Sequence, residues 1–146
     1  MRILFLFLPA LAGCMAVSAP PPGPPLSGEV RAQIEASEAP FRVPGTVAAR
    51  LGQEVRLGDL RLRPLAVVED SRCPLGVTCV WAGRLRVRVA VSGAGEPVME
   101  PNRPVAVPGG RRLTLVAVAP PKWHRPPPGV DPHAPQRFAF RLAAAD

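Results

Sequence analysis

The sequence predicts an all-β fold, an antiparallel β-sandwich or small barrel of roughly six to eight strands. Three observations predict it: apolar residues alternate at period two in several runs, Gly- and Pro-rich reversals separate these runs, and no helix-length apolar period lies between them. The 146 residues include 13 Gly and 21 Pro, which disfavour long helices. Residues 41–146 have the size of one domain with a modest core.

The clearest strand covers residues 84–91. Its apolar residues, from Leu85 to Val91, occupy every second position and should face the core, because side chains of a strand alternate between its two faces. Arg84, Arg86 and Arg88 then share the opposite face. This arginine stripe is either the solvated face of a half-buried sheet or a binding surface for an anionic envelope component, such as lipid phosphates or acidic glycans.

Three further long strands and three short ones are expected. The long runs are 60–68, 112–118 and 137–142, and the short ones are 46–50, 53–57 and 104–107. In the last long run, Phe138, Phe140 and Leu142 should point inward, and Arg137, Ala139 and Arg141 outward. In 112–118, the inward face should hold Leu113, Leu115 and Ala117. Arg61 and Arg63, on the first long run, should flank the arginine stripe.

Residues 1–13 have the pattern of a secretory signal. Arg2 supplies the positive start, residues 3–11 are apolar, and Ala12 and Gly13 are small. The apolar run is too short to cross a bilayer as a helix. The pattern therefore predicts export and removal of the leader.

The end of this leader, Leu11-Ala12-Gly13-Cys14, resembles the lipobox of bacterial lipoproteins. The resemblance implies cleavage before Cys14 and acylation of that cysteine, with more than one acyl chain as a membrane anchor. Met15 stands where an aspartate retains enteric lipoproteins in the inner membrane. The expected location is therefore the cell envelope, at the outer membrane and facing the periplasm.

Residues 14–40 are expected to form the acylated N-terminus and a proline-rich linker. Residues 19–26 favour an extended polyproline conformation. Residues 27–40 are polar, with only Val30 and Ile34 as an apolar i, i+4 pair, so one or two helical turns are the most that the sequence supports there. We therefore expect a semi-rigid spacer before the β-domain of residues 41–146.

Cys73 and Cys79 are predicted to form a structural disulfide. An exported pair normally oxidises, and Pro74 and Gly76 between the cysteines favour a compact reversal. With Cys14 acylated, the two remaining cysteines also form an even pair. A redox pair would need the C-x-x-C spacing, which is absent. A metal site would need His124 and His133 as further ligands, at spacings unlike those of known zinc sites.

The two tryptophans have different surroundings. Trp81 follows Cys79 closely and is expected to pack in the core against the disulfide. Trp123 lies among prolines and cations, where it either packs on one end of the sandwich or serves as an exposed anchor for a partner.

Residues 70–83 carry the pattern D-S-R-C-P followed by C-x-W-x-G. This element resembles one found in small bacterial lipoproteins and secreted proteins of uncharacterised function. The resemblance implies an all-β envelope domain and no activity. Its residues here are Asp70, Ser71, Arg72, Cys73, Pro74, Cys79, Trp81 and Gly83, whereas Arg84 departs from the usual acidic or small residue. Asp70 and Arg72 could pair, and Asp70 could also cap the reversal.

Neither charge nor motifs indicate catalysis. The net charge is +7, from 18 basic and 11 acidic residues, but export argues against a nucleic-acid partner. The chain has no G-x-S-x-G, no phosphate-binding glycine loop and no H-E-x-x-H. We therefore predict no enzyme, no cofactor and no metal. The leading hypothesis is a membrane-anchored envelope lipoprotein with a structural or binding β-domain. The alternatives are an inhibitor or ligand-binding module that presents the Cys73–Cys79 loop, and a periplasmic metal-binding protein.

Overall fold

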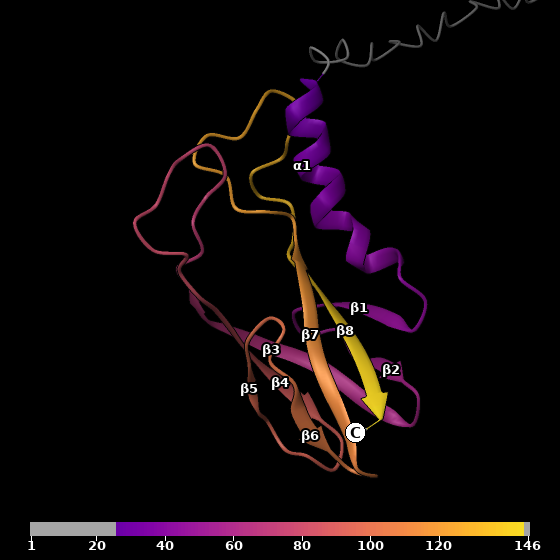
Figure 1. Cartoon of the computed structure of the whole chain (residues 1–146). Coiled ribbons are helices and arrows are strands. Elements are labelled where there is room, and N and C mark those ends of the chain that lie inside the picture. The colour runs from indigo at the N-terminus through magenta and orange to yellow at the C-terminus, as the bar shows by residue number, and fades with distance from the viewer. Residues whose placement is uncertain (1–25, 145–146) are drawn as a thin grey trace, which may run out of the picture.

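The computed structural model describes residues 26–144, and these form a sandwich of two four-stranded antiparallel β-sheets (Figure 1). The strands of the first sheet, in spatial order, are β1 (Thr46–Arg50), β8 (Arg137–Ala144), β7 (Arg111–Ala119) and β6 (Val105–Val107). Those of the second are β2 (Val55–Leu57), β3 (Leu60–Asp70), β4 (Leu85–Val91) and β5 (Val98–Met99). The predicted all-β class is confirmed, and the sheets form an open sandwich rather than a closed barrel.

All the strands that the sequence predicts are present, with ends that shift by no more than two residues. Only β5 was not expected, because its two residues are too few to show an alternating pattern. The alternation in β4 has the predicted direction: Leu85, Val87, Val89 and Val91 are buried.

The core lies between the inner faces of the two sheets. Phe138 and Phe140 of β8 are fully buried and are the largest side chains in it. Phe140 lies opposite Leu115 of β7 and Val47 of β1, so it contributes to the centre of the first sheet. Leu62 and Met99 are the largest fully buried side chains that the second sheet contributes to the core.

Two predicted face assignments are wrong, each for a structural reason. A register shift between Leu115 and Ala117 inserts one extra residue in β7, so that Val118, and not Ala117, lies opposite Phe138. Ala139, expected outward, is fully buried. It lies on β8 between β1 and β7, and the short 3₁₀ helix η1 (Ala39–Arg42) contacts both of these strands. The Phe41 ring of η1 also lies 5.0 Å from the guanidinium of Arg137, which shares the outer face of β8 with Ala139.

A helix, α1 (Gly28–Glu38), replaces most of the spacer that the sequence predicts for residues 27–40. Ser27 caps it by accepting a hydrogen bond from the Val30 amide at 3.3 Å, and Glu38 forms an ion pair with Arg137 of β8 at 2.5 Å. None of its residues is buried. The cap and the ion pair stabilise a helix that would be marginal by itself.

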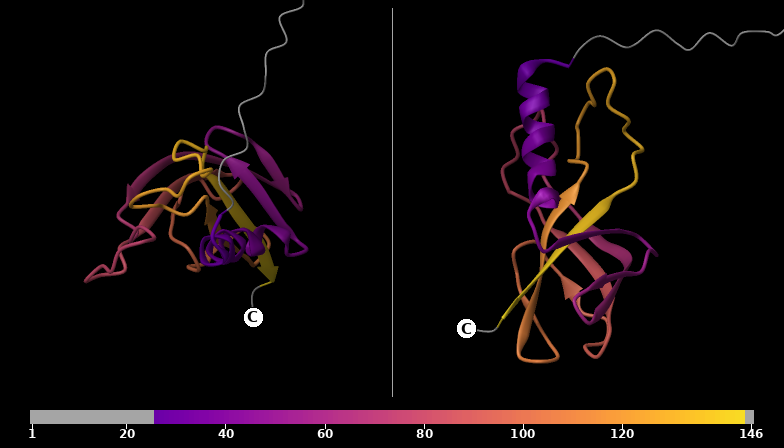
Figure 2. Two further views of the ribbon diagram at one scale, coloured as in Figure 1. Left: turned by 90° about the horizontal axis from the view of Figure 1, so that it is seen from above. Right: turned by 90° about the vertical axis from the view of Figure 1, so that its right-hand side faces the viewer.

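The long connections gather at one end of the molecule. Figures 1 and 2 place the start of α1, the loop of residues 71–84 and the loop of residues 120–136 at the same end, whereas β8 finishes at the opposite end. Seen from above, the loop of residues 71–84 projects away from the body (Figure 2, left). We call residues 71–84 and 120–136 together the loop end. Within residues 26–144, no helix has the length and apolar character needed to cross a bilayer.

Candidate functional site

The two cysteines of the loop end lie at disulfide distance. The Sγ atoms of Cys73 and Cys79 are 2.14 Å apart, and their Cα atoms are 5.9 Å apart. The bond closes a short loop, which restricts the unfolded chain and holds the loop in one compact shape.

Between the disulfide and the strands β3 and β4, two backbone hydrogen bonds and one bond to a serine hydroxyl join the two sides of the loop. The Ser71 amide donates to the Arg84 carbonyl at 2.8 Å, the Arg84 amide donates to Ser71 Oγ at 2.9 Å, and the Cys73 amide donates to the Ala82 carbonyl at 3.3 Å. Gly83 lies so close to the other side that a Cβ atom there would be 1.8 Å from the Ser71 carbonyl oxygen. We call this narrow part, residues 71–73 and 82–84, the loop neck.

The two loops of the loop end are also joined to each other. The Leu75 amide donates to the Lys122 carbonyl at 2.7 Å, and the His124 amide donates to the Leu75 carbonyl at 3.0 Å. Leu75 and Trp123 thus form a short parallel bridge. This bridge fixes the disulfide-closed loop against the proline-rich segment.

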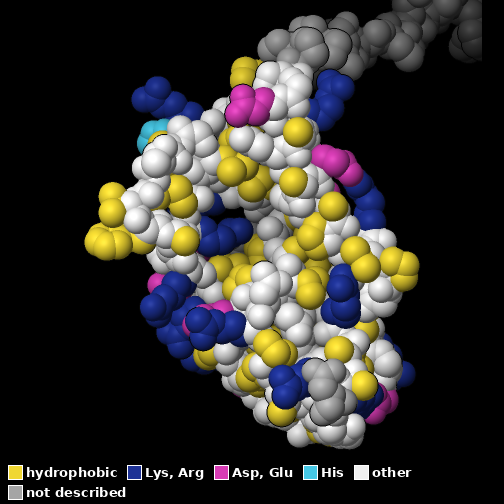
Figure 3. Space-filling model, viewed as in Figure 1, with side chains coloured by type: hydrophobic (Ala, Val, Ile, Leu, Met, Phe, Trp, Pro, Cys, Tyr) yellow, Lys and Arg dark blue, Asp and Glu magenta, His cyan; other side chains and the backbone are white. Residues whose placement is uncertain are grey.

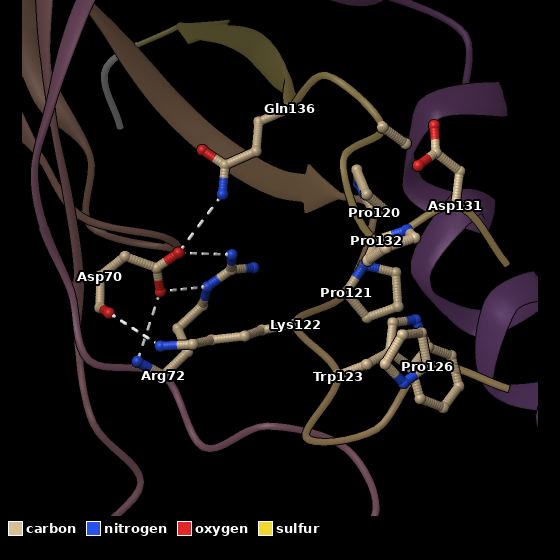
Figure 4. A pocket seen from close by; sticks show the side chains of 11 residues that line it. Asp70, Arg72, Pro120, Pro121, Lys122, Trp123, Pro126, Asp131, Pro132 and Gln136 are labelled. Carbon is tan, nitrogen blue, oxygen red and sulfur yellow. Dashed lines mark hydrogen bonds and ion pairs between the residues drawn. The ribbon is translucent and has the colours of Figure 1, made fainter.

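Asp70 is the polar centre between the loops (Figure 4). Its carboxylate accepts two hydrogen bonds from the Arg72 guanidinium, each at 2.8 Å, and one from Gln136 Nε2 at 3.3 Å. The Asp70 carbonyl accepts a hydrogen bond from Lys122 Nζ at 3.2 Å. The pairing of Asp70 with Arg72 was expected from the sequence. Lys122 and Gln136 were not expected, because neither lies in a motif that would connect it with Asp70 across the fold.

The hydrogen bonds from Arg72 hold the pKa of the half-buried Asp70 carboxylate below its usual value. A carboxylate whose pKa is lower in the folded state stabilises the fold above its unfolded-state pKa of about 4, and this stabilisation is lost as the pH falls through the folded-state pKa. We expect Asp70→Asn to lower the free energy of unfolding by about 1 kcal/mol near pH 7, with no loss at strongly acidic pH. Urea denaturation at several pH values measures this difference.

Asp59→Asn provides the matched control. Asp59 also pairs with an arginine, Arg111, and its pKa is also lowered, but its side chain is largely exposed to water. Solvent screening should therefore leave this variant close to wild type. Equal pH dependence for the two variants would show that Asp70 has no special role at the loop end.

A cavity of about 270 Å³ opens beside Asp70. Acidic, basic and amide side chains contribute its polar groups, as Figure 4 shows: Asp70, Asp131, Arg72, Lys122 and Gln136. The proline rings at 120, 121, 126 and 132 contribute its apolar walls. Trp123 also lines it; this side chain is half buried, and its Nε1 has no acceptor among the described residues. Trp123 therefore packs between the loops rather than standing out from the surface.

Trp81 does not pack against the disulfide in the core, so that prediction is wrong. Its side chain is 80% exposed, that of Val80 is 88% exposed and that of Val77 is 40% exposed. We call these three residues the apolar tip. One signal could have indicated this exposure: consecutive residues of an extended chain point to opposite sides, so Val80 and Trp81 could not both reach one core. In Figure 3, hydrophobic side chains gather over the projecting lobe that holds this loop.

The arginine stripe is interrupted by acidic side chains. Arg88 is exposed, and Arg84 lies in the loop neck just before β4. Arg86 is half buried. Its Nε lies 3.6 Å from Glu100 Oε1, and its Nη1 lies 4.0 Å from Glu69 Oε2. Part of the positive charge expected on this face is therefore balanced within the protein.

The residues proposed for the metal alternative are not gathered around one point. Among residues 26–144, no three His, Cys, Asp or Glu side chains cluster in a way that could hold a metal ion. Cys73 and Cys79 are at bonding distance from each other, and His133 is exposed.

Cys14, the predicted lipidation site, lies outside the described residues. Comparison of the chain with protein-family models, curated proteins and solved structures finds no match.

Proposed function

We propose that this chain is a lipid-anchored protein of the cell envelope, whose β-sandwich is a non-catalytic domain that binds another envelope component through its loop end. The observation that carries the binding role is the exposure of Val80 and Trp81 directly after the loop that the Cys73–Cys79 disulfide closes. Exposed aromatic side chains on a pre-organised loop are typical of binding sites, because little conformational entropy is lost on association.

The leader and the cysteines support the envelope location. The Leu11–Cys14 segment has the pattern of a lipobox, and Met15 favours the outer membrane, on its periplasmic side. A disulfide between Cys73 and Cys79 requires an oxidising compartment, in agreement with export. The D-S-R-C-P and C-x-W-x-G element is in line with a small envelope protein of this kind.

A second candidate is an inhibitor that presents the Cys73–Cys79 loop itself. The exposure of Val77 favours it. However, Leu75 is half buried and both its backbone groups are bonded to the proline-rich segment, so only part of the closed loop is available to a partner. The binding surface that we propose therefore extends beyond the closed loop, to Val80 and Trp81.

Processing at Cys14 tests the anchor. Mass spectrometry of the protein purified from its own membranes should find a chain that begins at Cys14 and carries acyl groups, with the Cys73 and Cys79 thiols protected from alkylation until reduction. Cys14→Ser should abolish the acylated species. An unprocessed chain in the cytosol, with three alkylated thiols, would contradict the proposal.

A further inference from the structure

The apolar tip has the composition of a segment that contacts a membrane surface. Val80 and Trp81 are among the most exposed large hydrophobic side chains of the described residues. Trp has an apolar ring system with one polar N–H, so it prefers the boundary between water and hydrocarbon. Beside it, Val80 and Val77 add apolar surface without any polar group on their side chains.

The loop neck prevents the tip from turning back onto the protein. The hydrogen bonds of Ser71 with Arg84, the disulfide, and the close approach of Gly83 to the opposite backbone hold the two sides of the loop together. The tip projects from the body in the view from above (Figure 2, left). A convex, projecting apolar tip can enter a bilayer surface without any complementary pocket.

Charge around the tip favours an anionic surface. The two loops hold four cations, Arg72, Lys122, Arg84 and Arg125, against one acidic residue, Asp131. At the base of the loops, Asp70 pairs with Arg72, and Glu69 lines the same surface hollow as Trp81 and Arg84. Arg84 and Arg125 are exposed, and neither forms an ion pair within residues 26–144. In Figure 3, Lys and Arg side chains lie above and below the hydrophobic lobe, and Asp or Glu side chains lie among those below it. Such cations attract lipid phosphates, and the arginine fork can bind them in a bidentate manner.

The described chain begins at the same end of the molecule as the apolar tip, as a membrane anchor at Cys14 would require. The described chain begins at Leu26, at the loop end of the molecule (Figure 1). Cys14 lies twelve residues before Leu26, and a chain of that length spans at most about 40 Å. An acyl anchor at Cys14 would therefore keep Leu26, at the loop end, within about 40 Å of the bilayer that holds the anchor.

We propose that Val77, Val80 and Trp81 insert into the headgroup–acyl boundary of an anionic bilayer, with Arg84 and Arg125 near lipid phosphates. This proposal rests on the proposed membrane location, but it concerns a second, separate contact. We favour a bilayer over a protein partner because Arg84 and Arg125 are exposed, form no ion pair within residues 26–144 and can therefore meet the phosphates of anionic lipids.

Depth-dependent quenching of tryptophan fluorescence tests the insertion. The full-length protein carrying Trp123→Phe, purified from its own membranes, retains Trp81 as its one tryptophan. It is incorporated into vesicles of phosphatidylcholine and phosphatidylglycerol with brominated acyl chains. We expect Trp81 emission to shift to the blue and to fall about twofold or more, because bromine lies within the depth that interfacial side chains reach.

Two matched variants serve as controls. Trp81→Phe leaves Trp123, which packs between the loops, and its emission should be unchanged by the brominated lipids. Val80→Asp in the Trp123→Phe background should remove the quenching of Trp81 without preventing vesicle flotation through Cys14. Vesicles of phosphatidylcholine alone should quench Trp81 less strongly, since Arg84 and Arg125 then lack anionic headgroups.

The outcomes separate the tip from the anchor. Flotation of the protein with vesicles while Trp81 stays unquenched overturns the insertion and leaves the anchor intact. If the protein purified from its own membranes carries no acyl group at Cys14, the anchor is overturned. If Trp81 of that same protein is still quenched, the insertion is supported. A blue shift that appears only with added envelope proteins, and without quenching by brominated lipid, shows a protein partner and overturns the membrane proposal.

Discussion

Replacement of Gly83 by alanine is expected to open the loop neck and to destabilise the loop end by about 3 kcal/mol or more. Gly83 has a φ of +68°, in the left-handed region that disfavours side chains, and its Cβ would lie 1.8 Å from the Ser71 carbonyl oxygen. The atom in the way belongs to the backbone, so no side-chain rotation can relieve the contact. Hydrogen exchange of the Ser71 and Arg84 amides, together with urea denaturation, measures the effect.

Gly76→Ala is the matched control for this prediction. Gly76 lies in the same loop and also has a positive φ, +87°, but no atom lies within 4 Å of the position that its Cβ would take. The control therefore carries only the conformational penalty of about 1 kcal/mol. Similar losses of amide protection in the two variants would show that the close approach to Ser71 is not what determines the shape of the neck.

Phe140→Ala is expected to lower the free energy of unfolding by about 3–5 kcal/mol, the usual cost of removing a buried aromatic side chain. Phe140 is fully buried and lies between Val47 and Leu115 on the neighbouring strands of its sheet. Because this side chain is at the centre of the core, the neighbouring strands cannot close the space that its removal leaves. Urea denaturation of the two proteins measures the change.

Phe41→Ala tests whether burial, rather than the type of residue, sets that cost. Phe41 is only half buried, on η1, with the Arg137 guanidinium 5.0 Å from the centre of its ring. We expect a loss of about 1 kcal/mol, from partial exposure and a cation–π contact. A larger loss for Phe41→Ala than for Phe140→Ala would mean that α1 and η1, rather than the sandwich core, determine the stability.

The strands could be predicted because their pattern is local. Alternation in residues 84–91 requires only that one face of a sheet meets a core, and Leu85 to Val91 follow it. The predicted direction of a side chain was wrong where a feature outside the strand pattern changed it. The bulge after Leu115 moved Ala117 to the other face, and η1 lies on the outer side of the sheet on which Ala139 was expected to be exposed. Neither feature has a signal within the strand itself.

In the candidate site, too, the contacts between residues close in sequence could be predicted, and those between distant residues could not. The Cys73–Cys79 pair and the contact of Asp70 with Arg72 are close in sequence, and both could be predicted. The partners Lys122 and Gln136 lie 52 and 66 residues from Asp70, and only the folded sandwich brings them there. Tryptophan usually packs in a core, and although the alternation of Val80 and Trp81 keeps one of the two out of it, no local pattern says that Trp81 is exposed.

The opposite placement of the loop end and of the end of β8 has a practical consequence. β8 finishes at Ala144, at the end of the molecule remote from both loops (Figure 1). A fluorophore or an immobilisation tag joined close to Ala144 would therefore sit on the side turned away from any surface that the tip contacts. Biosensor chips prepared in this orientation would display the tip uniformly to the solution.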